Sequence, residues 1–306
     1  MEDPDGGDPL RAVGPSIGEH GAWFTALNRG KRSVALDLRT AQGREDLLVL
    51  LGGADVLVES FRPGVLARLG LDPEILRARF PRLVIASLTG WGQSGPWARR
   101  PAHDLNFLAI SGILGLDLAA NGEPRVPALQ WADLSAGGLA AALRIVAALL
   151  TRERSGRGCW LDIAMLDGLI GLQQTHWALA AAGVERDTLL SGEAPMYGLY
   201  RTRDERWVSV AALEPDFLSH LWAAAEGDVT HRGLATLFES DTHDAWDERL
   251  PDACVAPVLS PAEARRHPQV VARELFREDG LAHPPTGPVA GAPPRLGEHT
   301  ALELGR

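Results

Sequence analysis

The chain has 306 residues, of which 45% are hydrophobic and 23% are charged. These fractions are ordinary for a globular protein and exclude wholesale disorder, and the length suffices for one large domain or two smaller ones. The 40 acidic and 30 basic side chains give a formal net charge of −10, which disfavours non-specific binding to nucleic acid or to an anionic membrane.

Cysteine usage and the N-terminal residues indicate the cellular compartment. Cys159 and Cys254 are the only cysteines, which fits a reducing compartment and excludes a disulfide scaffold or a zinc site built from cysteines. No uninterrupted apolar run reaches the roughly 20 residues that span a bilayer. Residues 1–10 are acidic and rich in glycine and proline, unlike a signal or transit peptide. We therefore expect a soluble, cytoplasmic protein.

The first 90 residues alternate strand and helix patterns after an initial loop. We expect loop over residues 1–28, where glycine, proline and aspartate recur without a period. The strands expected next cover residues 32–39, 54–61 and 83–88, and the expected helices cover residues 42–51, 63–69 and 72–80. The apolar runs of the second and third strands are typical of buried parallel strands. This alternation predicts an α/β fold with a parallel sheet.

The rest of the chain is more helical and changes character near residue 190. An apolar, alanine-rich helix is expected over residues 134–154, and its composition predicts that it is buried. The other expected elements are helices at 104–116, 166–182, 215–226, 230–239 and 243–250, strands at 160–163 and 253–259, a β-hairpin of 196–201 with 207–212, and an extended tail at 284–294. The change near residue 190 predicts a second, smaller domain with an antiparallel element.

No nucleotide-binding fingerprint and no metal motif occur in the sequence. Residues 89–96 (TGWGQSGP) follow an expected strand and are rich in glycine, but they lack the spacing of a phosphate loop or a dinucleotide fingerprint. A plain turn and a close approach to a ligand both explain this run. The nine histidines are scattered, and no His-x-x-x-His or Glu-x-x-His pair has carboxylate support, so we expect no catalytic metal.

Three acidic side chains and one histidine stand at the expected starts of helices. His103 and Asp104 open one apolar helix, Asp133 stands just before the alanine-rich helix, and Glu214 starts a third helix. Each carboxylate can cap its helix or complement the helix dipole, with His103 as a polar loop residue. The same positions suit acid/base groups, because a helix N-terminus stabilises developing negative charge. The residues alone leave both interpretations open.

Basic side chains lie next to the expected strands. Arg29, Lys31 and Arg32 precede the first strand, and Arg62 and Arg68 follow the second. Ligands of an open parallel sheet bind beyond the carboxyl ends of its strands, so Arg62 is well placed to meet a phosphate group. A solvated positive face explains the same residues equally well.

Several motifs, in the same order along the chain, resemble those of the family III CoA-transferases. Within this superfamily the details are most similar to the α-methylacyl-CoA racemase branch, because His103 stands where transferases typically lack a histidine. The motifs that carry the resemblance are NRGKRSVALDL (28–38), ADVLVESFRPGVLARLGL (54–71), RLVIASLTGWGQSGP (82–96), AHDLNF (102–107), WAD (131–133), AALEPDF (211–217) and DACVAPVL (252–259).

The resemblance implies a role for each matching residue. His103 and Asp133 correspond to the two acid/base groups that flank the α-carbon of the substrate. Glu214 corresponds to the residue that orients His103 through a hydrogen bond, and Asp104 to one that helps hold the thioester region. The residues implied to bind coenzyme A, chiefly its phosphates or adenine, are Arg29, Arg62, Arg68 and Phe107.

The resemblance also implies a fold, an assembly and a reaction. The fold is a large Rossmann-like domain of residues 1–188 and 263–306 with a parallel sheet, into which a small α/β domain of residues 189–262 is inserted. Two chains are expected to interlock as a homodimer. The reaction is epimerisation at the α-carbon of a 2-methylacyl-CoA thioester, through an enolate, by two bases. It needs no metal and no cofactor beyond the coenzyme A of the substrate.

The chain departs from the family pattern at its start. The family normally opens with a strand–helix–strand unit, whereas residues 2–9 resemble the loop after that unit, and Ala102 replaces a glycine. A second chain that supplies this unit is therefore one expectation. Two other functions stay open. One is a CoA-transferase in which Asp133 attacks the thioester, although the presence of His103 disfavours this interpretation. The other is a non-catalytic or heteromeric member of the family.

Overall fold

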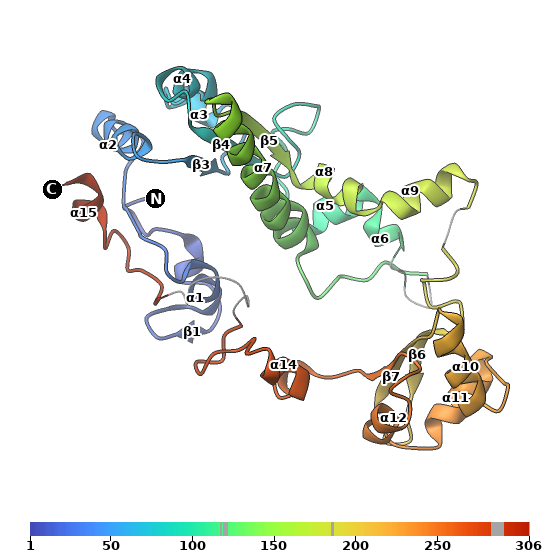
Figure 1. The fold of residues 1–306 in the computed structure, drawn as a ribbon. Coiled ribbons are helices and arrows are strands. Elements are labelled where there is room, and N and C mark those ends of the chain that lie inside the picture. Colours follow the sequence, from blue (N-terminus) through green and yellow to red (C-terminus); the bar gives the residue numbers. More distant parts are fainter. Residues whose placement is uncertain (117, 119–121, 185–186, 283–290, 306) are drawn as a thin grey trace. The chain divides into compact units, whose positions relative to one another are not determined.

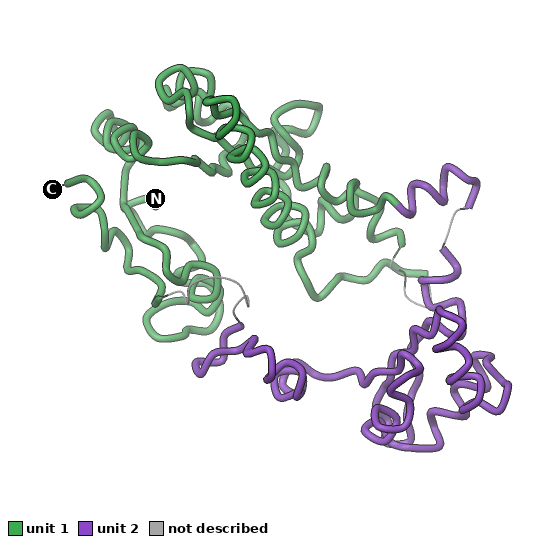
Figure 2. The backbone as a smooth tube through the Cα atoms, in the orientation of Figure 1, with its two compact units in different colours: residues 1–174, 288–306 green, residues 175–287 purple. Residues whose placement is uncertain are grey.

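The chain folds into two compact units, which Figure 2 colours separately. Unit 1 comprises Met1–Gln174 with Pro288–Arg306, and unit 2 comprises Thr175–Gly287. The computed structural model describes residues 1–116, 118, 122–184, 187–282 and 291–305, so the tail expected at 284–294 lies largely outside the described residues. The domain limits expected at residues 188 and 262 stay predictions, because compact units need not coincide with an inserted domain.

Unit 1 contains a parallel sheet of three strands (Figure 1). The strands are β3 (Val56–Glu59), β4 (Val84–Thr89) and β5 (Trp160–Ala164), in the order β3-β4-β5. β4 lies between the other two and is almost wholly buried, which explains why its sequence is mostly apolar. The predicted α/β fold with a parallel sheet is confirmed.

Helices of unit 1 begin close to the positions that the sequence predicts. At the start of α4 (Pro73–Arg79) the Asp72 carboxylate accepts a hydrogen bond from the Glu74 N–H, and Pro73 takes the first helical position. The other elements of unit 1 are η1 (Pro9–Arg11), β1 (Ser16–Ile17), β2 (His20–Gly21), α1 (Ala22–Asn28), α2 (Ala41–Leu51), α3 (Val65–Arg68), α5 (Asp104–Ser111), α6 (Ile113–Leu116), η2 (Ala132–Leu139), α7 (Ala140–Ser155), α8 (Met165–Leu172) and α15 (Thr300–Leu304).

Two of the apolar clusters of unit 1 hold helices in place near the sheet. One joins α2, α3 and α4 to the sheet through buried leucines such as Leu47, Leu66 and Leu76. The other lies where α5, η2 and α8 meet and is built around Phe107 and Leu169. Because burying one such side chain contributes about 1.5–3 kcal/mol, these clusters stabilise the helix positions on which any site at the end of the sheet depends.

Two predictions for the N-terminal region are wrong. Residues 1–28 are not entirely loop, because α1 and the short pair β1–β2 form there. Residues 32–39 do not form a regular strand. Within them Ala35 makes one parallel bridge to Glu2, and its N–H donates to the Thr300 hydroxyl instead of to a further strand. A strand needs a continuous neighbour, and the described residues provide this segment with a single bridge.

A large cavity lies beyond the carboxyl end of β3, whose outer edge pairs with no other strand among the described residues. Its volume is about 740 Å³. Phe61, Val65 and Leu69 line it from the residues that follow β3, and Leu36 and Leu38 line it from the extended segment before α2. We call this cavity, together with the open edge of β3, the β3 gap.

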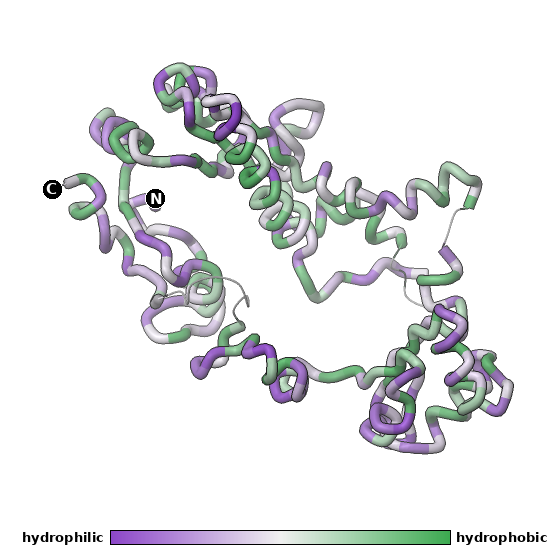
Figure 3. Tube along the Cα trace, in the orientation of Figure 1, coloured by the Kyte–Doolittle hydropathy of each residue, from purple (hydrophilic) through white to green (hydrophobic). Residues whose placement is uncertain are grey.

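α7 is much more exposed than its composition predicts, so the expectation of a buried helix is wrong. Its buried residues are Ala141, Ala148 and Arg152, and the helix packs on β4 and β5. Composition does not reveal which faces of a helix find a partner, and Figure 3 shows hydrophobic residues along much of α7. Four large aliphatic side chains, three in this helix and one in the residue just before it, are 53–72% exposed, and we call them the α7 stripe: Leu139, Leu143, Val146 and Leu150.

The segment Ala132–Ser155, which comprises η2 and α7, is long and apolar enough to cross a membrane by length and composition alone. Within unit 1 the same segment packs on the parallel sheet. Arg152 pairs with the Asp55 carboxylate at 2.9 Å, and Arg144 donates to the carbonyl of Asp162. These polar contacts belong to a helix of a folded α/β unit.

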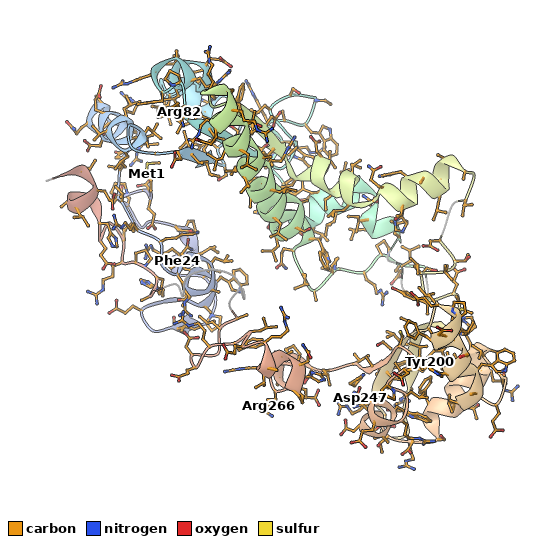
Figure 4. The ribbon with its side chains drawn as sticks, in the orientation of Figure 1. Met1, Phe24, Arg82, Tyr200, Asp247 and Arg266 are labelled. Atoms are coloured by element: carbon orange, nitrogen blue, oxygen red, sulfur yellow. The ribbon has the colours of Figure 1, made fainter. Side chains whose placement is uncertain are left out.

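A shielded ion pair ties the first residues to the rest of unit 1. The Arg11 guanidinium donates to both carboxylate oxygens of Glu2, at 2.6 and 2.7 Å, and the two side chains are only 10–12% exposed. The Ser33 hydroxyl donates to the same carboxylate. The hydrogen bond from Arg11 is the main reason that the pKa of Glu2 falls to about 2, although burial opposes the shift. Arg11 also lies 4.0 Å above the ring of Phe24, labelled in Figure 4.

We expect Glu2→Gln to lower the free energy of unfolding by about 2–3 kcal/mol at neutral pH, because the pKa of Glu2 falls from 4.5 to about 2 on folding. A carboxyl group whose pKa is lower in the folded chain than in the unfolded chain stabilises the fold at pH values above its unfolded pKa. The difference between wild type and variant should therefore shrink as the pH falls from 4.5 towards 2. Urea titrations at several pH values measure it.

The control is Glu19→Gln, which removes an exposed ion pair with Arg295. This pair should contribute less than about 1 kcal/mol, since solvent screens it. Equal losses of stability in the two variants would contradict a special role for Glu2.

Unit 2 contains an antiparallel sheet with helices. β6 (Tyr197–Arg201) and β7 (Trp207–Ala211) form the predicted hairpin, and β8 (Val255–Pro257) pairs with β7. Tyr200, labelled in Figure 4, lies in the core of this unit and stacks on Phe238 at 5.4 Å between ring centroids. The helices are α9 (Gln174–Ala181), which starts at the end of unit 1, α10 (Pro215–Ala224), α11 (His231–Glu239), α12 (His243–Arg249), α13 (Pro261–Ala264) and α14 (Pro268–Ala272).

Candidate active site

The glycine-rich run at residues 89–96 turns the chain at the carboxyl end of β4. The Thr89 hydroxyl accepts a hydrogen bond from the Gly92 N–H at 3.0 Å. The Asp162 carboxylate, from β5, accepts one from the Gln93 N–H at 3.1 Å. Both bonds hold the run against the end of the sheet, where ligands of parallel sheets bind.

The ring of Phe107 packs directly on this turn. A Cβ added at Gly90 would lie 2.0 Å from the ring, so a larger residue there would displace Phe107. Trp91 packs edge-to-face on the same ring, with centroids 4.7 Å apart. The turn and α5 therefore share an aromatic wall.

α5 begins with two hydrogen bonds that involve side chains. His103 is the N-cap residue, and its N–H donates to the side-chain oxygen of Asn106 at 3.0 Å. The expectation that Asp104 caps this helix is wrong, because Asp104 is its first helical residue. Its carboxylate instead accepts a hydrogen bond from the Asp133 N–H at 2.9 Å. That bond joins the start of α5 to the start of η2.

Asp133 is the second residue of η2, a wide helical turn of π type that continues into α7. It therefore lies inside a helix and does not cap one, contrary to expectation. Partial burial in the cavity is the main reason that the pKa of Asp133 is raised, and the nearby Asp104 carboxylate raises it further. His103 lowers the pKa of Asp133. A raised pKa brings a carboxyl group closer to neutrality, where it can both give and accept a proton.

The raised pKa of Asp133 predicts a pH dependence of stability. A carboxyl group whose pKa is higher in the folded chain than in the unfolded chain stabilises the fold at pH values below its unfolded pKa. This contribution is lost as the pH rises through the folded pKa. Asp133→Asn should therefore unfold at a higher temperature than wild type at neutral pH and at the same temperature at low pH. Thermal unfolding at both pH values measures this, and a gain confined to low pH would contradict it.

His103 and Asp133 line the same cavity, of about 630 Å³, within unit 1. The lining comes from the residues after β3, the glycine-rich turn, and the starts of α5, η2 and α8. Other side chains in this lining are Arg62, Trp91, Arg100, Asn106, Phe107 and Met165. The structure thus brings together an imidazole, a carboxyl group with a raised pKa, two guanidinium groups and an aromatic wall.

Two arginines give this cavity a basic character. Arg62 lies where the sequence predicts, just after β3, and Arg100 stacks on Trp97 with its guanidinium 4.0 Å from the ring centroid. The other two arginines expected to bind coenzyme A, Arg29 and Arg68, do not line this cavity. Arg29 follows α1 and Arg68 ends α3.

Glu214 lies in unit 2, as the N-cap residue of α10, and its side chain makes no capping hydrogen bond. The two units are described separately, so the role of Glu214 in orienting His103 stays a prediction. Within the described parts of the chain, no group of three or more His, Cys, Asp or Glu side chains could hold a metal ion.

Sequence reasoning misses three residues of the cavity: Arg100, Asn106 and Met165. Asn106 carries a usable signal, because the third residue of a helix often bonds back to the N-cap residue. Arg100 precedes a proline in a loop and Met165 opens α8, and neither position has a local pattern that indicates a site. Only the fold brings them to one cavity.

Comparison with known proteins places the chain in a family. The family model of CoA-transferase family III matches residues 1–304. The chain belongs to this family. As a member of CoA-transferase family III, it is 36% identical to the α-methylacyl-CoA racemase of Mus musculus, over 94% of this chain and 83% of that protein. It is 34% identical to the racemase of Homo sapiens, over 90% of this chain and 80% of that protein.

CoA-transferases are similar to this family III chain as well. The acetyl-CoA:oxalate CoA-transferase of Acetobacter aceti is 31% identical over 94% of this chain and 80% of that protein. A CAIB/BAIF family protein from Brucella suis, known from a crystal structure, has a TM-score of 0.85 at 28% identity, covering 98% of this chain and 89% of its own. The predicted family and fold are confirmed, and the family consists of enzymes, with racemases and transferases among its members.

Proposed function

We propose that this chain is an α-methylacyl-CoA racemase-like enzyme that epimerises the α-carbon of a 2-methylacyl-CoA thioester. The observation that carries the proposal is the shared cavity of His103 and Asp133, which offers an imidazole and a carboxyl group with a raised pKa. The similarity to two racemases, at 34% and 36% identity, supports it.

Epimerisation needs a base on one face of the α-carbon and an acid on the other. One of His103 and Asp133 takes the α-proton, and the electron pair of the C–H bond moves towards the thioester oxygen to give an enolate. The other residue then returns a proton to the opposite face, and the C=O bond forms again. Because the two residues exchange roles in the reverse direction, Asp133 must act both as an acid and as a base, and its raised pKa favours this. Glu214 orients His103 in this proposal.

The remaining groups of the cavity suit the two ends of an acyl-CoA. The guanidinium groups of Arg62 and Arg100 match the phosphates of coenzyme A. Trp91 and Met165 offer apolar surface to the acyl group. Since the chain supplies both the acid and the base, we propose that the reaction needs no cofactor beyond the coenzyme A of the substrate.

The proposed function is tested by exchange of the α-proton. The purified protein is incubated with (2R)- and (2S)-2-methylacyl-CoA in deuterated water, and mass spectrometry with chiral analysis follows deuterium uptake and configuration. Uptake accompanied by epimerisation supports the racemase. A folded protein that binds the thioester but takes up no deuterium would refute it.

A CoA-transferase is the second candidate, and the similarity to the acetyl-CoA:oxalate CoA-transferase favours it. In this reaction the Asp133 carboxylate attacks the thioester carbonyl, forming a mixed anhydride and releasing the thiolate of coenzyme A. Hydroxylamine would convert that anhydride into a hydroxamate at Asp133, which peptide mass spectrometry detects. Hydroxamate formation that requires acyl-CoA, without deuterium uptake, would select this candidate.

We also propose that two copies pair as an interlocked homodimer, and the α7 stripe supports this. Its four aliphatic residues recur at intervals of three and four along the helix, the spacing at which one helix packs on another. Contiguous exposed apolar surface of this kind marks an interaction site in soluble proteins.

We expect the double variant Leu143→Glu/Val146→Glu to behave as a single chain in light scattering at concentrations where the wild type has the mass of two chains. Burying two carboxylates in an apolar contact is strongly unfavourable, so the dimer should dissociate. Arg154→Gln, an exposed change on the same helix outside the stripe, is the control and should stay dimeric. Survival of the dimer in the double variant would exclude the α7 stripe as its contact.

The β3 gap supports a further partner. We propose that a second chain supplies a parallel strand that pairs with the open edge of β3 and covers the apolar lining at Leu36 and Phe61. Hydrogen exchange tests this: those amides of Val56–Glu59 that face the outer edge, away from β4, should become protected only in the complex with the co-purified partner. We propose the cytoplasm as the location, where the free thiols of Cys159 and Cys254 stay reduced.

A further inference from the structure

Asn106 presents an amide group to the cavity in a determined orientation. Its side-chain oxygen accepts the hydrogen bond from the His103 N–H at 3.0 Å, so the oxygen and not the nitrogen faces the backbone. The Nδ2 group of the same amide makes no hydrogen bond among the described residues. Asn106 is exposed, and it lines the cavity that also holds His103 and Asp133.

The neighbouring side chains of Asp104, His103 and Asp133 are less suited than Asn106 to donate a hydrogen bond to a carbonyl oxygen. The Asp104 carboxylate accepts the hydrogen bond from the Asp133 N–H. His103 and Asp133 must change protonation state during the proposed reaction, so neither is a constant donor to a carbonyl oxygen. The Asn106 amide is neutral and always carries two N–H donors. It is therefore suited to hold an oxygen atom on which negative charge develops.

We propose that the Nδ2–H group of Asn106 donates a hydrogen bond to the thioester carbonyl oxygen and stabilises the enolate that forms there. This inference rests on the proposed epimerisation of an acyl-CoA. When the base takes the α-proton, the C–H electron pair becomes the C=C bond, and the carbonyl π electrons move to oxygen. The C–S bond stays intact and Asn106 keeps both of its protons, so the residue lowers the energy of the enolate without entering the proton balance.

The position of Asn106 on α5 strengthens this interaction. It is the third residue of an eight-residue helix, next to the first N–H groups, which carry partial positive charge. The bond to His103 fixes the amide before substrate arrives, so the donor needs no reorganisation when charge develops. Removal of one such donor typically lowers kcat by about 10²–10³-fold.

Two substitutions separate the donor from the helix cap. Asn106→Asp keeps an oxygen that accepts the His103 N–H but lacks the Nδ2 donor, whereas Asn106→Ala lacks both. Wild type and variants are compared in the rate of deuterium uptake from 2-methylacyl-CoA, in KM and in thermal unfolding. Their affinity for an S-alkyl-CoA thioether, which has no carbonyl oxygen, reports on the cavity itself.

We expect deuterium uptake to fall by about 100-fold or more in both variants, while KM and the affinity for the thioether stay those of the wild type. Asn106→Asp should keep the thermal midpoint of the wild type. The pH profile of deuterium uptake in Asn106→Ala should match that of the wild type, because this variant loses only a neutral group. Uptake near the wild-type rate in Asn106→Ala, or a parallel loss of thioether affinity, would overturn the proposal and leave Asn106 a helix cap. Absence of uptake in the wild type would overturn the epimerisation itself, a failure distinct from that of Asn106.

Discussion

His103→Ala and Asp133→Ala should each lower the rate at which a 2-methylacyl-CoA is epimerised by roughly 10²–10⁴-fold. Each variant retains one base, which can still remove and return a proton on its own face of the α-carbon. We therefore expect deuterium uptake without inversion from one epimer only, and from opposite epimers in the two variants. Incubation of the separate epimers in deuterated water, followed by mass spectrometry and chiral analysis, measures both quantities.

Binding is the control for this experiment. The proposed contacts to coenzyme A come from arginines, so the affinity for an S-alkyl-CoA thioether should change little in either variant. Loss of binding in both variants would mean that His103 and Asp133 have structural roles at the starts of their helices. Asp133→Asn sharpens the distinction, because an amide keeps the shape of the side chain but cannot exchange a proton at neutral pH.

Gly90→Ala should damage the fold and the cavity together. The new Cβ would lie 2.0 Å from the ring of Phe107, and that ring is buried and packed on Trp91. Phe107 can yield only by opening the aromatic wall of the cavity. We expect the free energy of unfolding to fall by about 1–3 kcal/mol and thioether binding to weaken in parallel. Urea titration and calorimetric binding measure the two effects.

The matched control for this change is Gly171→Ala. Gly171 lies in α8, and a Cβ added there meets no atom within 4 Å. Alanine forms helix better than glycine by about 1 kcal/mol, so this variant should be as stable as the wild type or more so. A Gly90→Ala variant with wild-type stability and binding would show that the contact between the turn and Phe107 does not shape the cavity.

The elements that the sequence predicts best are those with local signals. α4 starts at an Asp-Pro pair, a common start of a helix, and β4 is a mostly apolar run of the right length for a buried strand. Residues 32–39 carry a comparable pattern, yet they form no regular strand, because a strand also needs a neighbour. The exposure of α7 escapes prediction for the same reason, since burial depends on what packs against a helix.

The candidate site is predictable only in part. Nothing in the spacing of His103 and Asp133 shows that they share a cavity, and the resemblance to the family supplied the pair. The contact that joins them runs through Asp104, between two helices whose packing no local pattern encodes. Likewise the lowered pKa of Glu2 depends on Arg11 and Ser33, which only the folded chain brings to it.

The β3 gap also bears on how the chain behaves in concentrated solution. An unpaired strand edge beside apolar surface is a template for pairing with any extended segment of another molecule, and so for aggregation. Two features oppose this: β3 is only four residues long, and the net charge of −10 makes molecules repel one another. Dissolved ions screen that repulsion, so the chain should stay dispersed at low ionic strength and aggregate more readily as salt is added. A strand bound at the open edge of β3 would remove this dependence of solubility on salt.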